Sequence, residues 1–295
     1  MPRSRSAGWF VSAGIAMLVV GVTVLAVLAL QRAAPETARQ APEPVPTFTL
    51  GAQVPTPTPT PTASAPTVRP EDVRMLSIGS EIWWRATAGD CDGIAPSVER
   101  SNDRGASWTD VTPTYLGLAQ VQTLEAFSRS DAEIVATLVD CEPQALRTYT
   151  YGRFWEAYPD VLARARFIDP ADPSSVRFPS GPVPAPCPVA TGLHAFGDIV
   201  TLVCDRRAWS WSADQWVDLG VTDALAVDID RSDILVAHAS PDCAGVAFTR
   251  VPAADPAAAT PAGCAADADT SGPVAIDGAG DTIVIWAGDA IISAS

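Results

Sequence analysis

The sequence predicts an all-β fold for residues 71–295, which we call the body. Short runs of β-branched and aromatic residues alternate there with Gly, Pro, Asp and Ser, a pattern typical of strands joined by turns. Such runs occupy residues 82–84, 134–137, 199–203 and 283–286. No amphipathic helical stripe of more than about two turns interrupts them. In addition, one strand pattern recurs along the body.

The recurring pattern is a short apolar strand, a polar turn, and an acidic residue close to a β-branched run. Copies centred on Ile82, Ile134, Val176, Ile234 and Ile283 are 52, 42, 58 and 49 residues apart. Because propeller blades repeat every ~40–50 residues, this spacing predicts a β-propeller of about five blades. A further copy at Ile199 leaves six blades as the alternative, and a β-sandwich is the second architecture that fits the strands.

Closure of the ring is expected to involve the start of the body. The final unit, residues 274–295, is short. We expect the strand near residues 73–78 to lie beside it, because closing the ring removes exposed strand edges.

A turn motif, Ser-x-Asp-x-Gly-x-Ser-Trp, begins at Ser101 and ends at Trp108. Gly105 tolerates the positive φ that a tight turn needs, and the side chains of Ser101 and Asp103 can accept hydrogen bonds from the turn's N–H groups. Trp108 starts the next strand with a large apolar side chain. The motif resembles the Asp-box (BNR repeat) of sialidase-like β-propellers, in which the box is a structural element away from the ligand face.

Two later segments resemble this box less closely. Residues 148–155 keep the hydroxyl, Gly and Trp, and residues 209–216 keep the closing Trp. For an active sialidase the resemblance would imply three arginines, a Tyr–Glu nucleophile pair and an Asp acid. Only Arg74 is placed like the family's first arginine, no Tyr follows Tyr158, and no Glu follows Glu156. The resemblance therefore implies a degenerate propeller, and no catalytic residue is carried over.

Residues 1–70 differ from the body in composition. Residues 6–31 carry no charge, and residues 10–30 are almost wholly apolar, long enough to span ~30 Å of hydrocarbon. We expect a cytoplasmic tail at residues 1–6, a transmembrane helix serving as an uncleaved signal-anchor at residues 7–30, and a Pro/Thr-rich disordered linker at residues 31–70. A cleaved signal peptide is the alternative.

All six cysteines follow this span, which suits an oxidising compartment and predicts a single-pass cell-membrane protein with an extracytoplasmic body. The cysteines are Cys91, Cys141, Cys187, Cys204, Cys243 and Cys264. Six cysteines allow 15 pairings, which the sequence alone does not separate. Our hypothesis pairs Cys187 with Cys204 and Cys243 with Cys264 within blades, and Cys91 with Cys141 between neighbouring blades.

The composition excludes some functions. A net charge of −15 argues against nucleic acid as a partner, because phosphate binding needs a basic surface. The sequence contains no Gly-x-Ser-x-Gly, His-Glu-x-x-His, Cys-x-x-Cys or phosphate-loop motif. The two histidines, His194 and His238, are expected to be half-buried strand residues rather than ligands. We assign no catalytic, cofactor-binding or metal-binding residue.

Tryptophans provide the remaining candidates for a ligand surface. Trp83 and Trp84 are adjacent in a predicted strand and must point to opposite faces, while Trp209 and Trp211 share a face. Packing between blades is the expected role of these residues and of Trp216, in preference to a platform for stacking sugars.

The sequence thus predicts a non-catalytic binding or scaffold module for an envelope protein or a wall polymer. The alternative is a carbohydrate-active, sialidase-like enzyme. A glycosidase needs only two carboxylates, which would face each other in a pocket roughly 5–10 Å apart.

Overall fold

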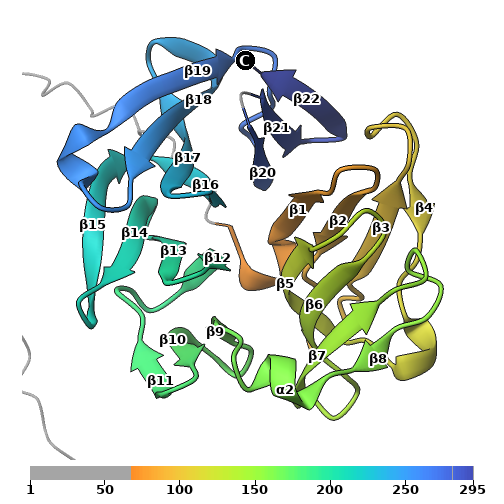
Figure 1. Cartoon of the computed structure of the whole chain (residues 1–295). Coiled ribbons are helices and arrows are strands. Elements are labelled where there is room, and N and C mark those ends of the chain that lie inside the picture. Colours follow the sequence, from red (N-terminus) through yellow and green to blue (C-terminus); the bar gives the residue numbers. More distant parts are fainter. Residues whose placement is uncertain (1–67, 281, 295) are drawn as a thin grey trace, which may run out of the picture. The chain divides into compact units, whose positions relative to one another are not determined.

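Each sheet of the protein is a short antiparallel meander, because turn residues separate consecutive β-branched runs. The computed structural model describes residues 68–280 and 282–294. Within these residues six sheets, numbered blades 1 to 6 in chain order, surround a common axis with the first strand of each blade innermost (Figure 1). The described part of the chain is therefore an all-β, six-bladed β-propeller.

Blades 1 and 2 have four strands each and blade 3 has three. Blade 1 contains β1 (Arg74–Ile78), β2 (Trp83–Thr87), β3 (Ser97–Ser101) and β4 (Thr109–Asp110). Blade 2 contains β5 (Gln120–Ala126), β6 (Ala132–Thr137), β7 (Pro143–Thr148) and β8 (Glu156–Ala157). Blade 3 contains β9 (Phe167–Asp169), β10 (Asp172–Phe178) and β11 (Gly181–Pro184). The helical turns in this half are η1 (Pro70–Asp72), η2 (Thr114–Leu116) and α2 (Pro159–Leu162).

Blades 4 and 5 again have four strands each, and blade 6 has three described strands. Blade 4 contains β12 (Ala190–Phe196), β13 (Ile199–Cys204), β14 (Arg207–Ser212) and β15 (Gln215–Thr222). Blade 5 contains β16 (Ala224–Asp230), β17 (Asp233–Ser240), β18 (Cys243–Pro252) and β19 (Thr260–Ala265), with η3 (Pro256–Ala258) before its last strand. Blade 6 contains β20 (Val274–Ala279), β21 (Thr282–Ala287) and β22 (Ala290–Ala294).

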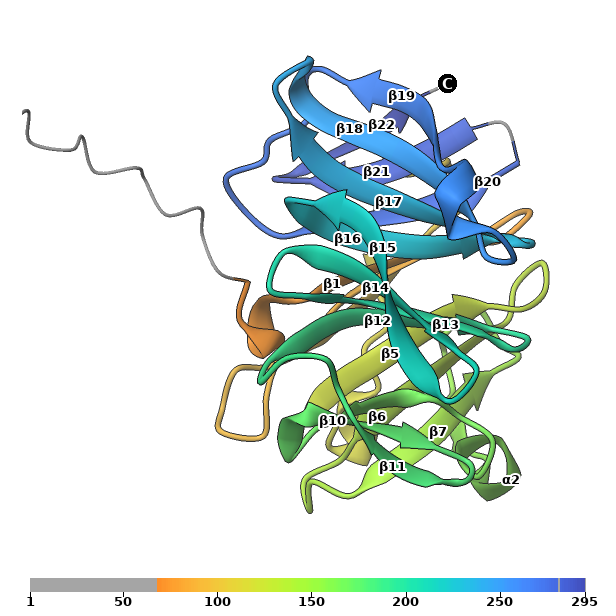
Figure 2. The ribbon, with the colours of Figure 1, turned by 90° about the vertical axis from the view of Figure 1, so that its left-hand side faces the viewer.

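The two faces of the ring differ in what they carry. We call the face at the N-terminal ends of the innermost strands the lower face, and the opposite face the upper face. Val68, where the described chain begins, lies at the lower face beside Thr191 and Val274, and Figure 2 shows η1 on this side. The turn at residues 101–109 lies at the upper face, because β3 runs in the same direction as β1.

Blades 6 and 1 close the ring through their innermost strands. The Ile78 N–H donates to Asp277 Oδ2 at 3.0 Å, and Arg74 Nη1 donates to the Gly288 carbonyl at 2.5 Å. The strand at residues 74–78 thus lies beside the final unit, as expected. It is hydrogen-bonded into its own sheet with β2, however, so closure depends on packing between sheets rather than on a shared sheet.

The expected count of five blades was wrong, and six is correct. The repeated β-branched residues mark the second strand of each blade, and Ile199 begins β13, the second strand of blade 4. Val176 lies in β10 of the separate blade 3, which spans only residues 167–184. A blade this short breaks the period of ~40–50 residues, which is why two blades looked like one.

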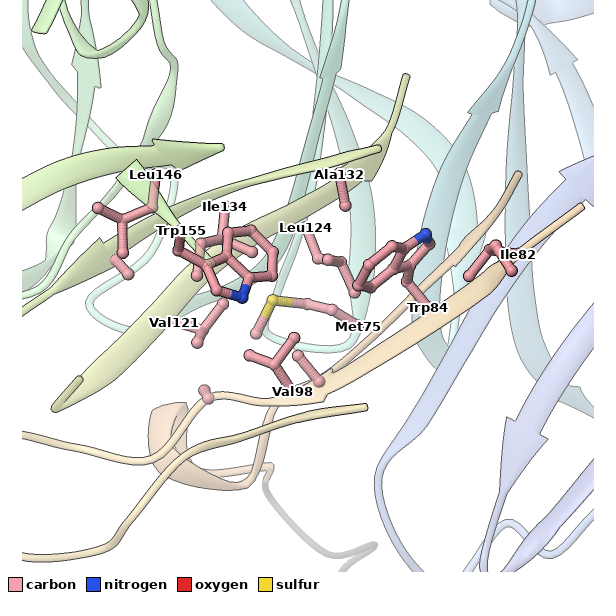
Figure 3. Packing of buried hydrophobic residues seen from close by; sticks show 13 residues of the cluster. Met75, Ile82, Trp84, Val98, Val121, Leu124, Ala132, Ile134, Leu146 and Trp155 are labelled. Atoms are coloured by element: carbon pink, nitrogen blue, oxygen red, sulfur yellow. The ribbon is translucent and has the colours of Figure 1, made fainter. Parts of the chain in front are cut away.

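Apolar clusters fill five of the six interfaces between neighbouring blades in the described residues. Between blades 1 and 2 the cluster includes Met75, Trp84 and Val98 from blade 1, with Leu124 and Ile134 from blade 2 (Figure 3). Comparable clusters lie between blades 3 and 4, 4 and 5, 5 and 6, and 6 and 1. Between blades 2 and 3 the described residues form no such cluster.

The tryptophans pack between blades. Trp84 is fully buried against blade 2, whereas Trp83 packs on the cluster between blades 6 and 1. Trp211 lies with its ring centroid 5.1 Å from Phe178 and 5.2 Å from Trp216, at the interface of blades 3 and 4. Trp216 also donates its indole N–H to the Pro184 carbonyl at 2.9 Å. These residues form packing contacts rather than a free aromatic platform.

Three disulfides join the pairs put forward from the sequence. Cys243–Cys264 links two strands of blade 5, and Cys91–Cys141 links a loop of blade 1 to a loop of blade 2. Cys187–Cys204 ties the segment that enters blade 4 to that blade's second strand. The expectation that this last bridge lies within a blade needs a small correction, because Cys187 precedes β12.

The expected tail, transmembrane helix and nearly all of the linker lie outside the described residues. Within residues 68–280 and 282–294, no helix is both long and apolar enough to span a bilayer.

Candidate functional site

Five of the six innermost strands place a polar side chain at one level of the axis. We call these the axial positions, and they are occupied by Ser77, Glu125, His194, Asp228 and Asp277. Strand register supports their equivalence. Each axial residue lies on the innermost strand of its blade, opposite a residue of the second strand. Ser77 lies opposite Trp84, and Glu125 lies opposite Glu133. All five side chains line one cavity of about 410 Å³ in the channel toward the upper face.

A repeated hydrogen bond links these positions from blade to blade. Asp228 Oδ2 accepts the N–H of Gly278 at 2.7 Å, and Asp277 Oδ2 accepts the N–H of Ile78 at 3.0 Å. Ser77 Oγ accepts the N–H of Ala126 at 2.8 Å. In each case the acceptor belongs to one blade, and the donor directly follows the axial residue of the next blade. We call these three contacts the axial hydrogen bonds; they join blades 5, 6, 1 and 2.

His194 extends this chain to blade 4. Its Nδ1 lies 3.1 Å from Asp228 Oδ1. Burial alone would lower the pKa of His194, but the hydrogen bond to Asp228 and the charges of Asp228, Asp277 and Glu125 outweigh burial, so the pKa is raised above 6.5. The imidazole is therefore a donor to Asp228 at mildly acidic pH.

Asp277 is a buried carboxyl group whose pKa is raised. Burial and the neighbouring charge of Asp228 raise its pKa to about 8, against the opposing effects of the Ile78 N–H and His194. The shift favours the protonated form beside a second carboxyl group. Asp277 Oδ2 accepts the axial hydrogen bond from Ile78 in either form.

Glu125 makes no axial hydrogen bond, because none of the hydrogen bonds in the described residues involves its side chain. Blade 3 is the next blade, and its innermost strand has only three residues. Burial, followed by the charges of Glu133 and Asp228, raises the pKa of Glu125. Glu125 is thus an accessible acceptor facing a gap, at a position where blades 6, 1 and 2 each supply an N–H to the blade before them.

The cavity extends from Glu125 into the interface between blades 2 and 3, and we call this part the cleft. On the blade 2 side, Glu125, Glu133 and Arg147 stand on neighbouring strands in direct register. Arg147 is ion-paired with Glu133 at 2.6 Å. On the other side the segment between α2 and β9 contributes Arg164 and Arg166. No ion pair involves either of these two arginines within the described residues.

Aromatic side chains surround Arg147. The Arg147 guanidinium lies 5.0 Å from the Phe127 ring centroid and 5.6 Å from that of Tyr158. Tyr149 packs edge-on against both rings. Phe196, which ends β12 of blade 4 and is 54% exposed, lines the cavity itself. The cavity therefore combines a free acceptor, free cationic donors and an exposed apolar ring, the features of a small binding site.

The turn residues identified from the sequence lie elsewhere. Asp103 accepts hydrogen bonds from the Ser107 N–H at 2.9 Å and from the Ser107 and Ser101 hydroxyls at 2.5 and 2.7 Å. These bonds lower the pKa of Asp103 to about 2. Gly105 has φ +85°, and Trp108 packs on the cluster between blades 6 and 1. The turn is a self-contained element of blade 1, and none of its residues lines the cavity.

Sequence reasoning missed the axial positions. His194 is a half-buried strand residue as expected, but its contact with Asp228 was not foreseen. One signal was available, since Asp277 is the single charged residue of its strand, and Asp228 shares an otherwise apolar strand only with Asp230 at its end. Within the described part of the chain, no group of three or more His, Cys, Asp or Glu residues is placed to hold a metal ion.

Comparisons with known proteins give a likeness of fold only. No family model and no curated protein matches the chain. Similar solved structures include "YCF48 bound to D1 peptide" (14% identity, 75% of this chain, 76% of that chain, TM-score 0.41). Others are a Trypanosoma rangeli sialidase (12%, 77%, 53%, TM-score 0.42) and the fungal lectin of Aleuria aurantia, a six-bladed β-propeller (10%, 72%, 86%, TM-score 0.42). This chain spans about half of the sialidase. Because these scores are below 0.5, the fold assignment rests on the six sheets themselves.

Proposed function

We propose that the protein is a membrane-tethered, extracytoplasmic propeller that acts as a non-catalytic binding or scaffold module for an envelope protein or a wall polymer, with the cleft as its ligand site. One observation carries this proposal. Of the six interfaces in the described residues, only that between blades 2 and 3 contains charged groups and open volume in place of an apolar cluster.

The open interface supports a functional reading. Glu125, Arg164 and Arg166 have no protein partner among the described residues, and Glu125 and Arg164 are exposed. Positions where a sequence departs from good packing are expected to be functional sites. The whole cavity, of which the cleft is one part, has a volume of about 410 Å³, which lies within the range of ~300–1,000 Å³ found for ligand pockets.

The disulfides support the proposed location. Three disulfides in the body suit an oxidising compartment.

Binding fits the axial carboxylates better than hydrolysis. Asp228 and Asp277 each accept a backbone N–H from a neighbouring blade, so these carboxylates act in holding the ring together.

We also propose that residues 101–108 are an Asp-box. In the family that this motif resembles, the ligand face lies away from the box, whereas here the cavity and the turn lie toward the same face.

A carbohydrate-active enzyme is the second candidate, and one observation favours it. Glu125 and Glu133 stand directly opposite each other on neighbouring strands of the same cavity. The raised pKa of Glu125 is a property of a general acid, and Glu133 would be the second carboxylate.

Site-specific photo-crosslinking in cells tests the binding proposal. A photoreactive phenylalanine analogue replaces Phe196, which lines the cavity from blade 4, or, as the matched control, Phe154, which is 69% exposed outside the cavity. We expect a covalent adduct from position 196 and none from position 154. The proposal is wrong if neither position, or both equally, gives an adduct.

Hydrolysis assays separate the two candidates. Isolated wall glycan is incubated with the full chain and with the Glu125→Gln variant, and new reducing ends are counted. A binding module releases none with either protein. Release by the wild-type chain that disappears in Glu125→Gln would establish the enzyme instead.

A further inference from the structure

We infer that the ligand of the cleft is an extended peptide segment of a partner protein, which donates a backbone N–H to Glu125 and so completes the hydrogen bond that blade 3 does not supply. This inference rests on the proposed binding function and adds the chemical class of the ligand.

The first argument is the repetition of the axial hydrogen bonds. Asp228, Asp277 and Ser77 differ in chemistry, yet each accepts a backbone N–H from the next blade. Glu125 occupies the equivalent position in blade 2, as its pairing with Glu133 shows. The geometry around the axis therefore places a backbone amide against each of these three acceptors, and the acceptor at Glu125 is free to take one from outside.

The second argument is the room beside Glu125. The innermost strands of the other five blades have five to seven residues, whereas β9 has three. The chain reaches β9 through α2 and a segment in which residues 164–166 line the cavity instead of packing as a strand. Open volume therefore remains beside Glu125, and a chain from outside can occupy it.

The third argument is the distribution of donors and apolar surface around Glu125. An extended peptide presents N–H and C=O groups alternately along its length. With one N–H on Glu125, the guanidinium groups of Arg164 and Arg166 on the opposite wall are available to peptide carbonyls. Phe196, which lines the same cavity, offers apolar surface to a side chain of the peptide.

A glycan is the competing ligand class. Its hydroxyl groups could also donate to Glu125 and accept from the two arginines. The observation that favours the peptide is that each of the three occupied axial acceptors takes a backbone N–H from the next blade, and Asp228 alone among them also contacts a side-chain donor, His194.

The test uses the full-length chain in detergent micelles and a phage-displayed library of random twelve-residue peptides as the probe. Selected peptides are synthesised, and their affinities are measured by fluorescence anisotropy for the wild type, for Glu125→Ala and for Asp242→Ala. Asp242 is an exposed acid in the loop between β17 and β18 and serves as the matched control. We expect about ten- to hundredfold weaker binding to Glu125→Ala, as for loss of a hydrogen bond to a charged group, and no change with Asp242→Ala.

Methylation of the peptide backbone identifies the donor. Each N–H of the best peptide is replaced in turn by N–CH₃. One position should weaken binding to the wild type as much as Glu125→Ala does, and the same methylation should have little further effect on Glu125→Ala, because both changes remove one contact. Full additivity at every position would overturn the inference.

Failure of this inference and failure of the proposed function give different results. If the adduct from position 196 is a glycan and no peptide is selected, the peptide inference is wrong and the binding function stands. If selected peptides bind Glu125→Ala as tightly as wild type, the role of Glu125 is wrong. If position 196 gives no adduct in cells, the proposed function itself fails.

Discussion

The interface between blades 1 and 2 and the interface between blades 2 and 3 have the same framework and opposite chemistry. The third strands of blades 1 and 2 both end in an Arg followed by a hydroxyl residue, Arg100-Ser101 and Arg147-Thr148. Ser101 and Thr148 each accept an N–H from the glycine four residues later, at 2.8 and 2.9 Å. The residues that pair with Arg100 in blade 1 and with Arg147 in blade 2 therefore occupy equivalent positions.

At one such position the two blades carry side chains of opposite character. Trp84 is the cross-strand partner of Arg100, and Glu133 is the partner of Arg147. Trp84 is completely buried and fills the space toward blade 2, whereas Glu133 pairs with Arg147 and leaves the space toward blade 3 open. A polar cleft can therefore arise within a regular ring of blades when one blade carries a charged side chain at a position where another blade carries an apolar one.

Truncation of Trp84 and of Glu133 to alanine tests most directly whether the two interfaces differ in packing. Trp84→Ala should cost about 3–5 kcal/mol of unfolding free energy, because a buried indole is replaced by a cavity. Glu133→Ala should cost about 1 kcal/mol or less, because only a partly exposed ion pair is lost. Urea denaturation of the two variants measures both values. Equal costs would show that Glu133 is a packing residue and that the two interfaces are alike.

The disulfide at the first interface should have the next largest effect. Cys91–Cys141 closes a loop of 50 residues between blades 1 and 2. Loss of that constraint on the unfolded chain is worth at most about 4 kcal/mol. The double variant Cys91→Ala/Cys141→Ala should therefore unfold at markedly lower urea, while the peptide affinity of the cleft stays unchanged. A large loss of affinity would mean that the two interfaces are coupled.

The pH dependence of stability distinguishes Asp277 from exposed acids. Its pKa rises from 3.8 in the unfolded chain to about 8 in the folded protein, so its contribution to stability is full below pH 4 and is lost as pH rises through 8. Asp277→Asn keeps the acceptor for Ile78 but cannot ionise. Its melting temperature relative to wild type should rise steadily between pH 4 and pH 8, then level off. Asp242→Asn is the control and should show no such trend; a flat difference for Asp277→Asn would exclude a raised pKa.

The smallest expected effects on stability come from removing Ser77, an axial acceptor that has a donor, and Glu125, the axial acceptor that has none. Ser77→Ala removes the acceptor for the Ala126 N–H and should cost about 1 kcal/mol. Glu125→Ala removes no hydrogen bond within the described residues and should change stability by less than about 0.5 kcal/mol. Thermal denaturation of the two variants measures the contrast. A larger cost for Glu125→Ala would show that Glu125 already has a partner in the protein.

Local patterns predicted much of the fold correctly. Alternation of β-branched and turn residues indicated the strands, and the recurring Ile or Val marked the second strand of each blade. The blade count was less predictable, because blade 3 is short and Val176 and Ile199 fall closer together than one usual repeat. The cleft was not predicted at all, since Glu125 and Glu133 look like ordinary surface acids in their own strands.

The sequence by itself determined the all-β character, the turn at residues 101–108 and cysteine positions compatible with the three disulfides, because strand alternation and turn chemistry act over a few residues. Only the tertiary structure decided the number of blades, the axial hydrogen bonds and the polar interface between blades 2 and 3. The reason is physical. Alternation assigns each side chain to one of two faces of a sheet, but which blade covers that face, and how closely, depends on contacts between residues far apart in the chain, such as Ile78 and Asp277.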